Sequence, residues 1–328
     1  MKKIIPIMIA TTMVLTAIVA VTDTDSDADF PGTYINGQLA TNGTIVDKDN
    51  EHWAYFDDGM IITGTTVFSG FIKNGDTSYC IYDGDGGTLN LILNGDLTIN
   101  AFDPDLDAVT LAIYTSGSLH ISGGGKLTIK CDDEFRNIYQ GLTAGENITI
   151  KNGEIEIWSE IDVTASQVGW DTSFTMSGGE LNLFGSGTIN AENVYIKGGK
   201  ININSSCGTV RNRIAAYSDH GESTLEMTGG YVKFTNVRMS TDNPLMSSTG
   251  NGVSHFDVHD ADGTNWTINE DNNLDAIEDG DVTVMFDKSM HKSITKDTDE
   301  PVVLGATVGC AALGLLIVVG MILIARKK

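Results

Sequence analysis

Two short acidic runs in the chain have the composition of a binding site for a hard cation. The first alternates aspartates with other residues between positions 103 and 107, and the second places three acidic residues in succession at 132–134. Carboxylates at such spacing can converge on one ion, and Ca²⁺ prefers oxygen ligands of this kind. The alternative is that both runs are solvated acidic loops. The predicted ligands of a calcium cofactor are Asp103, Asp105, Asp107, Asp132, Asp133 and Glu134.

Aromatic and amide side chains form a second group of candidate functional residues, which are suited to binding a ligand. Ile155 and Ile157 alternate with polar residues, and if they are buried in a strand, Trp158 points outward. Aromatic rings offer large amphipathic contact areas, which suit sugar rings. The alternative is that these rings cover loop backbone. The predicted ligand-binding residues are Trp158, Tyr195, Asn182, Asn202 and Trp170.

These residues lie in a repeated sequence unit. Each copy has two alternating runs around a Gly-Gly or Asn-Gly corner, as in LILNGDLTIN (91–100), ITIKNGEIEIW (148–158) and VYIKGGKININ (194–204). The copies recur every 20 to 31 residues, a period typical of solenoids. The last glycines of the six corners are Gly95, Gly125, Gly153, Gly179, Gly199 and Gly230.

The alternation of side chains predicts which kind of solenoid this is. A period of two indicates strands with one buried face, and the exported region has no useful stretch of helical pattern. We therefore expect an all-β ectodomain, a right-handed parallel β-helix, with glycines where the bend needs positive φ and stacked turns leave no room. The same parity predicts an outward polar ladder flanked by Phe184, Trp158 and Tyr195. Its members are Thr98, Thr128, Glu156, Asn182, Asn202 and Lys233.

Three stretches of the sequence resemble a known family: ITGTTVFSGFIKNGDTSYCIYDGDGGTLNLILNGDLTI (62–99), LAIYTSGSLHISGGGKLTI and YQGLTAGENITIKNGEIEI. The family they resemble is the polysaccharide-binding parallel β-helix family of carbohydrate-binding domain-containing surface proteins. The resemblance covers roughly residues 60–236 and implies a pectate-lyase-like fold, polysaccharide as the partner, calcium at the corners of the turns, and no established catalysis. The chain departs from the family pattern where aspartate precedes a Gly-Ile pair, because Gln140, Ser166 and Ala216 stand at comparable positions.

The two ends predict export and a membrane anchor. Lys2 and Lys3 precede an apolar run, as in a secretory signal. Residues 302–325 carry no charge and are followed by Arg326, Lys327 and Lys328, which predicts a single transmembrane helix with its tail in the cytoplasm. The folded region is then extracellular at the plasma membrane. The net charge of −24 argues against a nucleic acid partner.

Together these features predict a membrane-anchored, adhesin-like surface protein that binds polysaccharide and is not an enzyme. Two alternatives stay open: a purely structural surface solenoid, and a polysaccharide lyase that uses arginines of the longer loops, Arg136, Arg211 and Arg213. The predicted divisions are a signal region (1–28), an N-terminal cap (29–66), a β-helix (67–240), a C-terminal cap (241–286), a stalk (287–301), a membrane helix (302–325) and a tail (326–328).

Overall fold

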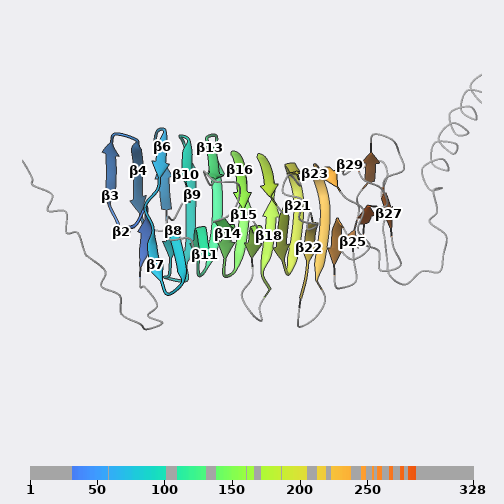
Figure 1. Cartoon of the computed structure of the whole chain (residues 1–328), viewed down its shortest axis with the longest axis horizontal. Coiled ribbons are helices and arrows are strands. Elements are labelled where there is room, and N and C mark those ends of the chain that lie inside the picture. The colour runs from blue at the N-terminus through green and yellow to red at the C-terminus, as the bar shows by residue number, and fades with distance from the viewer. Residues whose placement is uncertain are drawn as a thin grey trace, which may run out of the picture.

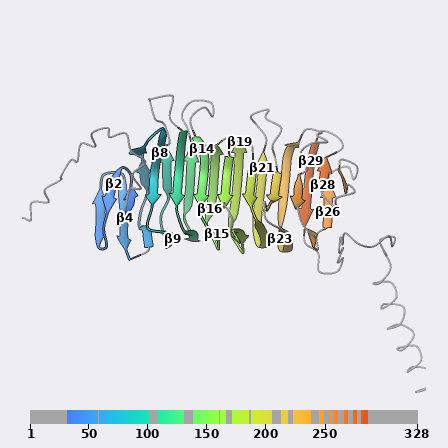
Figure 2. The same cartoon turned by 90° about the horizontal axis from the view of Figure 1, so that it is seen from below.

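The computed structural model is an elongated stack of strands, laid side by side along its longest axis (Figures 1 and 2). Its described residues are assigned to strands, turns and connecting segments, with no helix among them, and most strand pairs are parallel. The predicted all-β parallel solenoid is therefore confirmed. The structure describes residues 32–57, 59–100, 109–130, 138–159, 161–165, 171–185, 187–204, 213–218, 223–237, 245–248, 253–254, 257–260, 266–268, 274–276 and 280–285.

Among those residues, none belongs to a helix long and apolar enough to cross a membrane. The predicted signal region (1–28), stalk (287–301), membrane helix (302–325) and tail (326–328) lie outside the described part of the chain.

The chain winds through three rows of parallel strands, one strand of each row per turn. The first row is a sheet of its own, whereas the second and third rows belong to one sheet that bends at the glycine corners. The first row comprises β8 (Thr77–Asp83), β11 (Val109–Thr115), β14 (Ile138–Ala144), β17 (Ile161–Ala165), β20 (Thr188–Ala191), β22 (Arg213–Ala216) and β24 (Met246–Ser248).

The long strands β21 (Asn193–Asn204) and β23 (Thr224–Val237) pass through a corner and contribute to both remaining rows. The second row comprises β5 (Gly59–Ile62), β9 (Thr88–Leu93), β12 (Ser118–Gly123), β15 (Asn147–Ile150), β18 (Ser173–Met176), the first halves of β21 and β23, and β25 (Val253–Ser254). The third row comprises β6 (Thr66–Phe68), β10 (Leu97–Asn100), β13 (Lys126–Lys130), β16 (Glu154–Ser159), β19 (Glu180–Gly185) and the second halves of β21 and β23.

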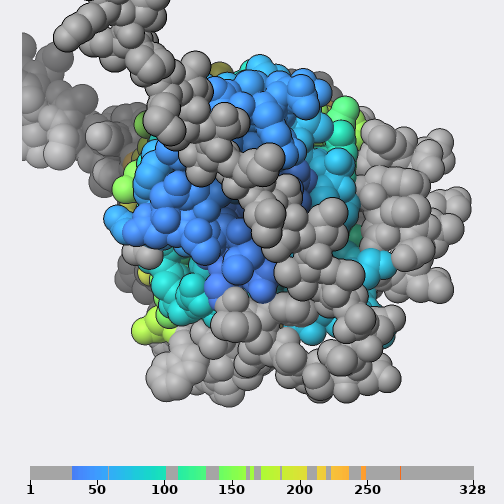
Figure 3. All heavy atoms as spheres, turned by 90° about the vertical axis from the view of Figure 1, so that its left-hand side faces the viewer, coloured from blue at the N-terminus to red at the C-terminus, as the bar shows by residue number. Residues whose placement is uncertain are grey.

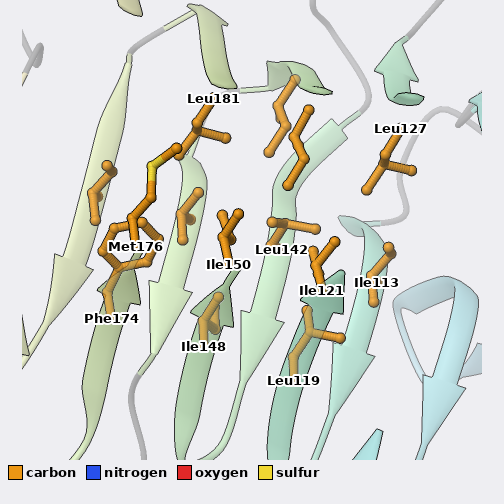
Figure 4. Packing of buried hydrophobic residues seen from close by; sticks show 14 of the residues in the cluster. Ile113, Leu119, Ile121, Leu127, Leu142, Ile148, Ile150, Phe174, Met176 and Leu181 are labelled. Atoms are coloured by element: carbon orange, nitrogen blue, oxygen red, sulfur yellow. The ribbon is translucent and has the colours of Figure 1, made fainter. Parts of the chain in front are cut away.

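The core is a set of aliphatic columns that run along the solenoid. In-register parallel pairing places equivalent inward residues of successive turns on top of one another, and these side chains fill the interior from all three rows (Figure 4). Cys80 is also fully buried and unpaired, and burial raises the pKa of its thiol. One column of the third row, with every member fully buried, consists of Leu97, Leu127, Ile155, Leu181, Ile201 and Val232.

The glycine corners stack directly on one another. A Cβ atom added to Gly179 would lie 2.5 Å from the carbonyl oxygen of Gly153, and one added to Gly230 would lie 2.6 Å from that of Gly199. These four glycines also have positive φ, as predicted. Gly95 and Gly125 are outside the left-handed region, so there the close approach of the preceding turn is the reason for glycine.

Antiparallel strands lie at both ends of the stack. At the N-terminal end, β1 (Thr33–Ile35) pairs with β2 (Gln38–Ala40) and β8, β7 (Ile72–Asn74) pairs with β8, and β3 (Thr44–Lys48), β4 (Glu51–Phe56) and β5 form a meander. Figure 3 views this end, where the blue residues lie across the solenoid. At the other end, β29 (Gly280–Met285) pairs with β23 and β26 (Asp257–Asp260), and β28 (Leu274–Ala276) pairs with β24 and β27 (Trp266–Ile268). Such strands cover the open ends of a solenoid.

Candidate functional site

The predicted polar ladder exists on the outward side of the third row, which we call the third face. Each ladder residue stands three positions after the last glycine of its corner and is half-buried. Parallel pairing then places each member opposite the next, so the predicted parity and register are both confirmed for this ladder. Its order along the solenoid is Thr98, Thr128, Glu156, Asn182, Asn202 and Lys233.

Trp158 and Phe184 are stacked neighbours beside this ladder. They pair in register between β16 and β19, with ring centroids 4.3 Å apart and planes 12° from parallel. Both are half-buried. Because each ring covers a face of the other, the stack does not offer two flat rings side by side, as a simple platform would. A ligand on this surface meets the pair as one aromatic ridge.

Charged groups hold this ridge in position. The Lys126 ammonium lies 2.8 Å from Glu154 Oε1 and 2.7 Å from Glu156 Oε2. Trp158 Nε1 donates a hydrogen bond of 2.9 Å to Glu156 Oε1. Glu156 therefore links the cation on one side to the indole on the other.

The pKa values of the linked groups reflect these contacts. Hydrogen bonds to Glu154 and Glu156 raise the pKa of Lys126 above its ordinary value. Partial burial acts to raise the pKa of Glu156, but the hydrogen bonds from Lys126 and Trp158 and the charge of Lys126 outweigh it, so that pKa is lowered. Both groups are charged at neutral pH.

Amides and a phenol form a second network further along the third face. Asn202 Nδ2 donates to Asn182 Oδ1 at 2.7 Å and to Glu180 Oε1 at 3.1 Å. The Tyr231 hydroxyl donates to Asn202 Oδ1 at 2.9 Å. Three successive turns are thereby connected by side chains that can also bind hydroxyl groups of a ligand.

A match to a family profile accords with this geometry. The profile is described as carbohydrate-binding domain-containing protein, and it matches residues 31–291, which is most of the chain. The chain belongs to this family. The match includes the N-terminal cap strands and every described turn of the solenoid. A search of curated proteins finds no match, and neither does a search of solved structures.

For this carbohydrate-binding family member, the structure brings together only part of the residue set proposed from the sequence. Trp158, Asn182 and Asn202 share the third face. Tyr195 lies in the second row, where it pairs with Thr175 and its ring carries Lys197 Nζ 5.2 Å from the centroid. The expectation that Tyr195 flanks the ladder is wrong, because the residue precedes the glycine corner.

The remaining predicted site residues lie in stretches that the structure does not describe. Among the residues that the structure does describe, no three His, Cys, Asp or Glu side chains gather in a way that could hold a metal ion. Outside the described ranges lie Trp170, Asp103, Asp105, Asp107, Asp132, Asp133 and Glu134.

Sequence reasoning missed three contributors to the third face. Lys126, Glu180 and Tyr231 each stand one position after the last glycine of a corner, and parallel pairing places all three in one outward row. The spacing from the glycines was a usable signal, because it had already located the ladder two positions further on. The spacing does not indicate which side chains of neighbouring turns bind one another.

Proposed function

We propose that this chain binds a polysaccharide on the third face and does so without catalysis. The observation that carries the proposal is the in-register row of amide, carboxylate and phenol groups, connected between turns and bordered by the Trp158 and Phe184 ridge. Sugar recognition needs such polar groups next to apolar surface. The family match supports the same ligand class.

The shape of the surface favours a long ligand over a single sugar. The polar row repeats once per turn, so a chain of sugars can make similar contacts at successive positions. One aromatic contact contributes only about 0.5–1.5 kcal/mol. Useful retention therefore comes from several contacts along one polymer.

Two further parts of the proposal concern the cellular location of the protein and the handedness of the solenoid. Residues 302–325 and the basic tail after them support a single-pass anchor, with the solenoid outside the plasma membrane as an adhesin-like protein. A right-handed winding follows from the strong preference of parallel crossovers for that hand.

Calcium belongs to this proposal as well. The acidic runs at 103–107 and 132–134 have the oxygen ligands that the ion prefers. If calcium at these runs supports binding, a chelator weakens polysaccharide retention and added Ca²⁺ restores it. If retention is the same with and without chelator, the cofactor part is abandoned and the third-face proposal stands.

A binding screen of the full-length chain in detergent micelles tests the main proposal. Immobilised chain is exposed to a panel of soluble neutral and acidic polysaccharides, and retention is measured by biolayer interferometry. Asn202→Ala should weaken retention several-fold, because Asn202 connects Asn182, Glu180 and Tyr231. The matched control is Thr228→Ala, an exposed position that directly precedes the glycine corner of β23 and so lies off the third face. Binding of none of the polysaccharides, or equal retention by both variants, would overturn the proposal.

A further inference from the structure

A hollow lies where the N-terminal cap meets the first glycine corners, away from Trp158. It has a volume of about 570 Å³ and is lined by Thr65, Asn94, Asp96 and Gly124, together with neighbouring glycines and Leu93. The hollow is shallow and open to solvent, so it suits a ligand that is bound from one side. The third face, by contrast, is an extended surface built from strands.

A second depression adjoins the hollow. It has a volume of about 510 Å³, shares Gly64 and Thr65 with the first, and adds Thr63, His52 and Asp47 of the cap. Both ring nitrogens of His52 are engaged, Nδ1 with Asp47 Oδ1 at 2.6 Å and Nε2 with the Asp49 carbonyl at 3.1 Å. The wall on this side is therefore held in place.

Several polar groups of the hollow and of the adjoining depression make no hydrogen bond within the described part of the protein. The side chains of Thr63, Thr65 and Asn94 are exposed and make no hydrogen bond to any described residue. Asp96 Oδ1 accepts the Lys126 backbone N–H at 3.0 Å, which orients its carboxylate. The hollow is thus lined by a threonine of the β5–β6 connection and by an asparagine and an aspartate of the next corner.

The charge of the lining limits the chemistry of the ligand. Asp96 contributes a carboxylate to the hollow, whose described lining includes no lysine or arginine, while Asp47 of the adjoining depression is paired with His52. The Lys126 ammonium, next to Gly125 in the chain, is paired with Glu154 and Glu156. Lys48, which follows Asp47, belongs to the side of the adjoining depression and not to the lining of the hollow. A uronate or sulfated sugar would be repelled, whereas the hydroxyl donors of a neutral sugar suit the acceptors on the walls.

We propose that this hollow is a second carbohydrate site, which takes a short neutral saccharide such as a branch or chain end. The inference rests on the proposed function in that the ligand is a carbohydrate. It adds a second place with its own specificity: the hollow selects neutral units by charge and hydrogen bonding, while the third face retains the polymer.

A plug at Gly124 tests the hollow without disturbing the fold. A Cβ atom at Gly124 would meet no atom within 4 Å, and the residue is outside the left-handed region of φ. Gly124→Trp should therefore fill the hollow with no change in melting temperature. The matched control is Gly87→Trp, at a corner between the first and second rows, where an added Cβ is equally unopposed and φ is likewise not left-handed.

The probes are neutral cello-, xylo- and manno-oligosaccharides of two to four sugars, and their binding to the full-length chain is measured by saturation-transfer NMR. Gly124→Trp should lower the affinity for the oligosaccharide that binds best by about tenfold or more, and Asn94→Ala by about three- to tenfold. Gly87→Trp should bind as the unchanged chain does. Asp96→Asn, which keeps an acceptor for the Lys126 N–H, should improve binding of acidic oligosaccharides relative to neutral ones.

The outcomes separate this inference from the proposed function. If polysaccharides bind and Asn202→Ala weakens them, but no neutral oligosaccharide binds or Gly124→Trp has no effect, the hollow is not a site and the third-face proposal stands. If Gly124→Trp blocks the oligosaccharides while Asn202→Ala leaves polymer retention intact, the hollow stands and the third face fails. If neither polymer nor oligosaccharide binds, both proposals are overturned.

Discussion

The second and third rows of the solenoid have the same backbone arrangement but different outward chemistry. On the second row, the hydroxyls of Ser118 and Ser173 contact the side-chain amide of Asn147 at 3.3 and 2.7 Å. On the third row, longer side chains such as Lys126 and Glu156 connect neighbouring turns and leave aromatic and amide surface between them.

The difference teaches that stacking alone does not make a binding face. Short side chains such as those of Ser118, Asn147 and Ser173 satisfy one another from turn to turn. On the third row, long side chains connect several turns, whereas the second-row pair Tyr195 and Lys197 contact each other within one strand. The glycine corner separates the two behaviours, because it divides each turn into a stretch before it and a stretch after it.

The largest expected effect comes from filling that corner. Gly179→Val places a branched side chain at a φ of 79° and within 2.5 Å of the Gly153 carbonyl oxygen. We expect a loss of about 2–4 kcal/mol in the free energy of unfolding, measured by chemical denaturation of the full-length chain in micelles. Gly124→Val, at an open position, should change it by less than about 0.5 kcal/mol. Equal stability of the two variants would mean that the turns are not stacked as described.

Aromatic substitutions on either side of the corner should separate stability from binding. Trp158→Ala removes the stack on Phe184 and the hydrogen bond to Glu156, and it should weaken polysaccharide retention several-fold and lower stability by about 1 kcal/mol. Tyr195→Ala removes only a second-row ring and its contact with Lys197. It should leave retention unchanged. If Tyr195→Ala loses polysaccharide retention and Trp158→Ala keeps it, the binding site lies on the second row.

The smallest expected effect is a difference in pH response between the rows. Burial lowers the pKa of His120 below its ordinary 6.5, and nearby Lys151 lowers it further. The unfolded chain then binds this proton more readily, so the free energy of unfolding decreases as pH falls below about 6.5. The lowered pKa of Glu156 instead contributes stability above its ordinary 4.5, which is lost only as pH falls further, through the folded-state pKa.

Thermal unfolding between pH 7 and 5 measures this difference. His120→Gln should flatten the decline over that range, while Glu156→Gln should leave its slope unchanged. If the slope in this range follows Glu156 and not His120, the assignment of the two responses to the two rows is wrong.

The sequence allowed the solenoid and the outward ladder to be predicted for a simple physical reason. Strand side chains alternate strictly, and the glycines mark equivalent positions, so Asn182 and Asn202, each three residues after a corner, had to meet. Tyr195 was misplaced because alternation specifies inward or outward but not which side of a corner a residue occupies. It stands four residues before Gly199 and therefore belongs to the preceding row.

Other parts of the site depend on geometry that alternation does not contain. The overlap of Trp158 and Phe184 follows from the spacing of adjacent turns, and the bonds of Lys126 follow from its reach across to β16. The hollow arises where cap strands far from the corner in sequence, around His52, meet Asn94. No local pattern at either segment indicates that meeting.

Hydroxyl-radical footprinting of the full-length chain tests the central claim most directly. Oxidation of Trp158, Phe184 and Tyr231 is measured by mass spectrometry with and without the polysaccharide that binds best, and Tyr195 serves as the internal reference on the second row. The account predicts protection of the three third-face rings and no change at Tyr195. Protection of Tyr195 with unchanged oxidation of Trp158 and Tyr231 would contradict it.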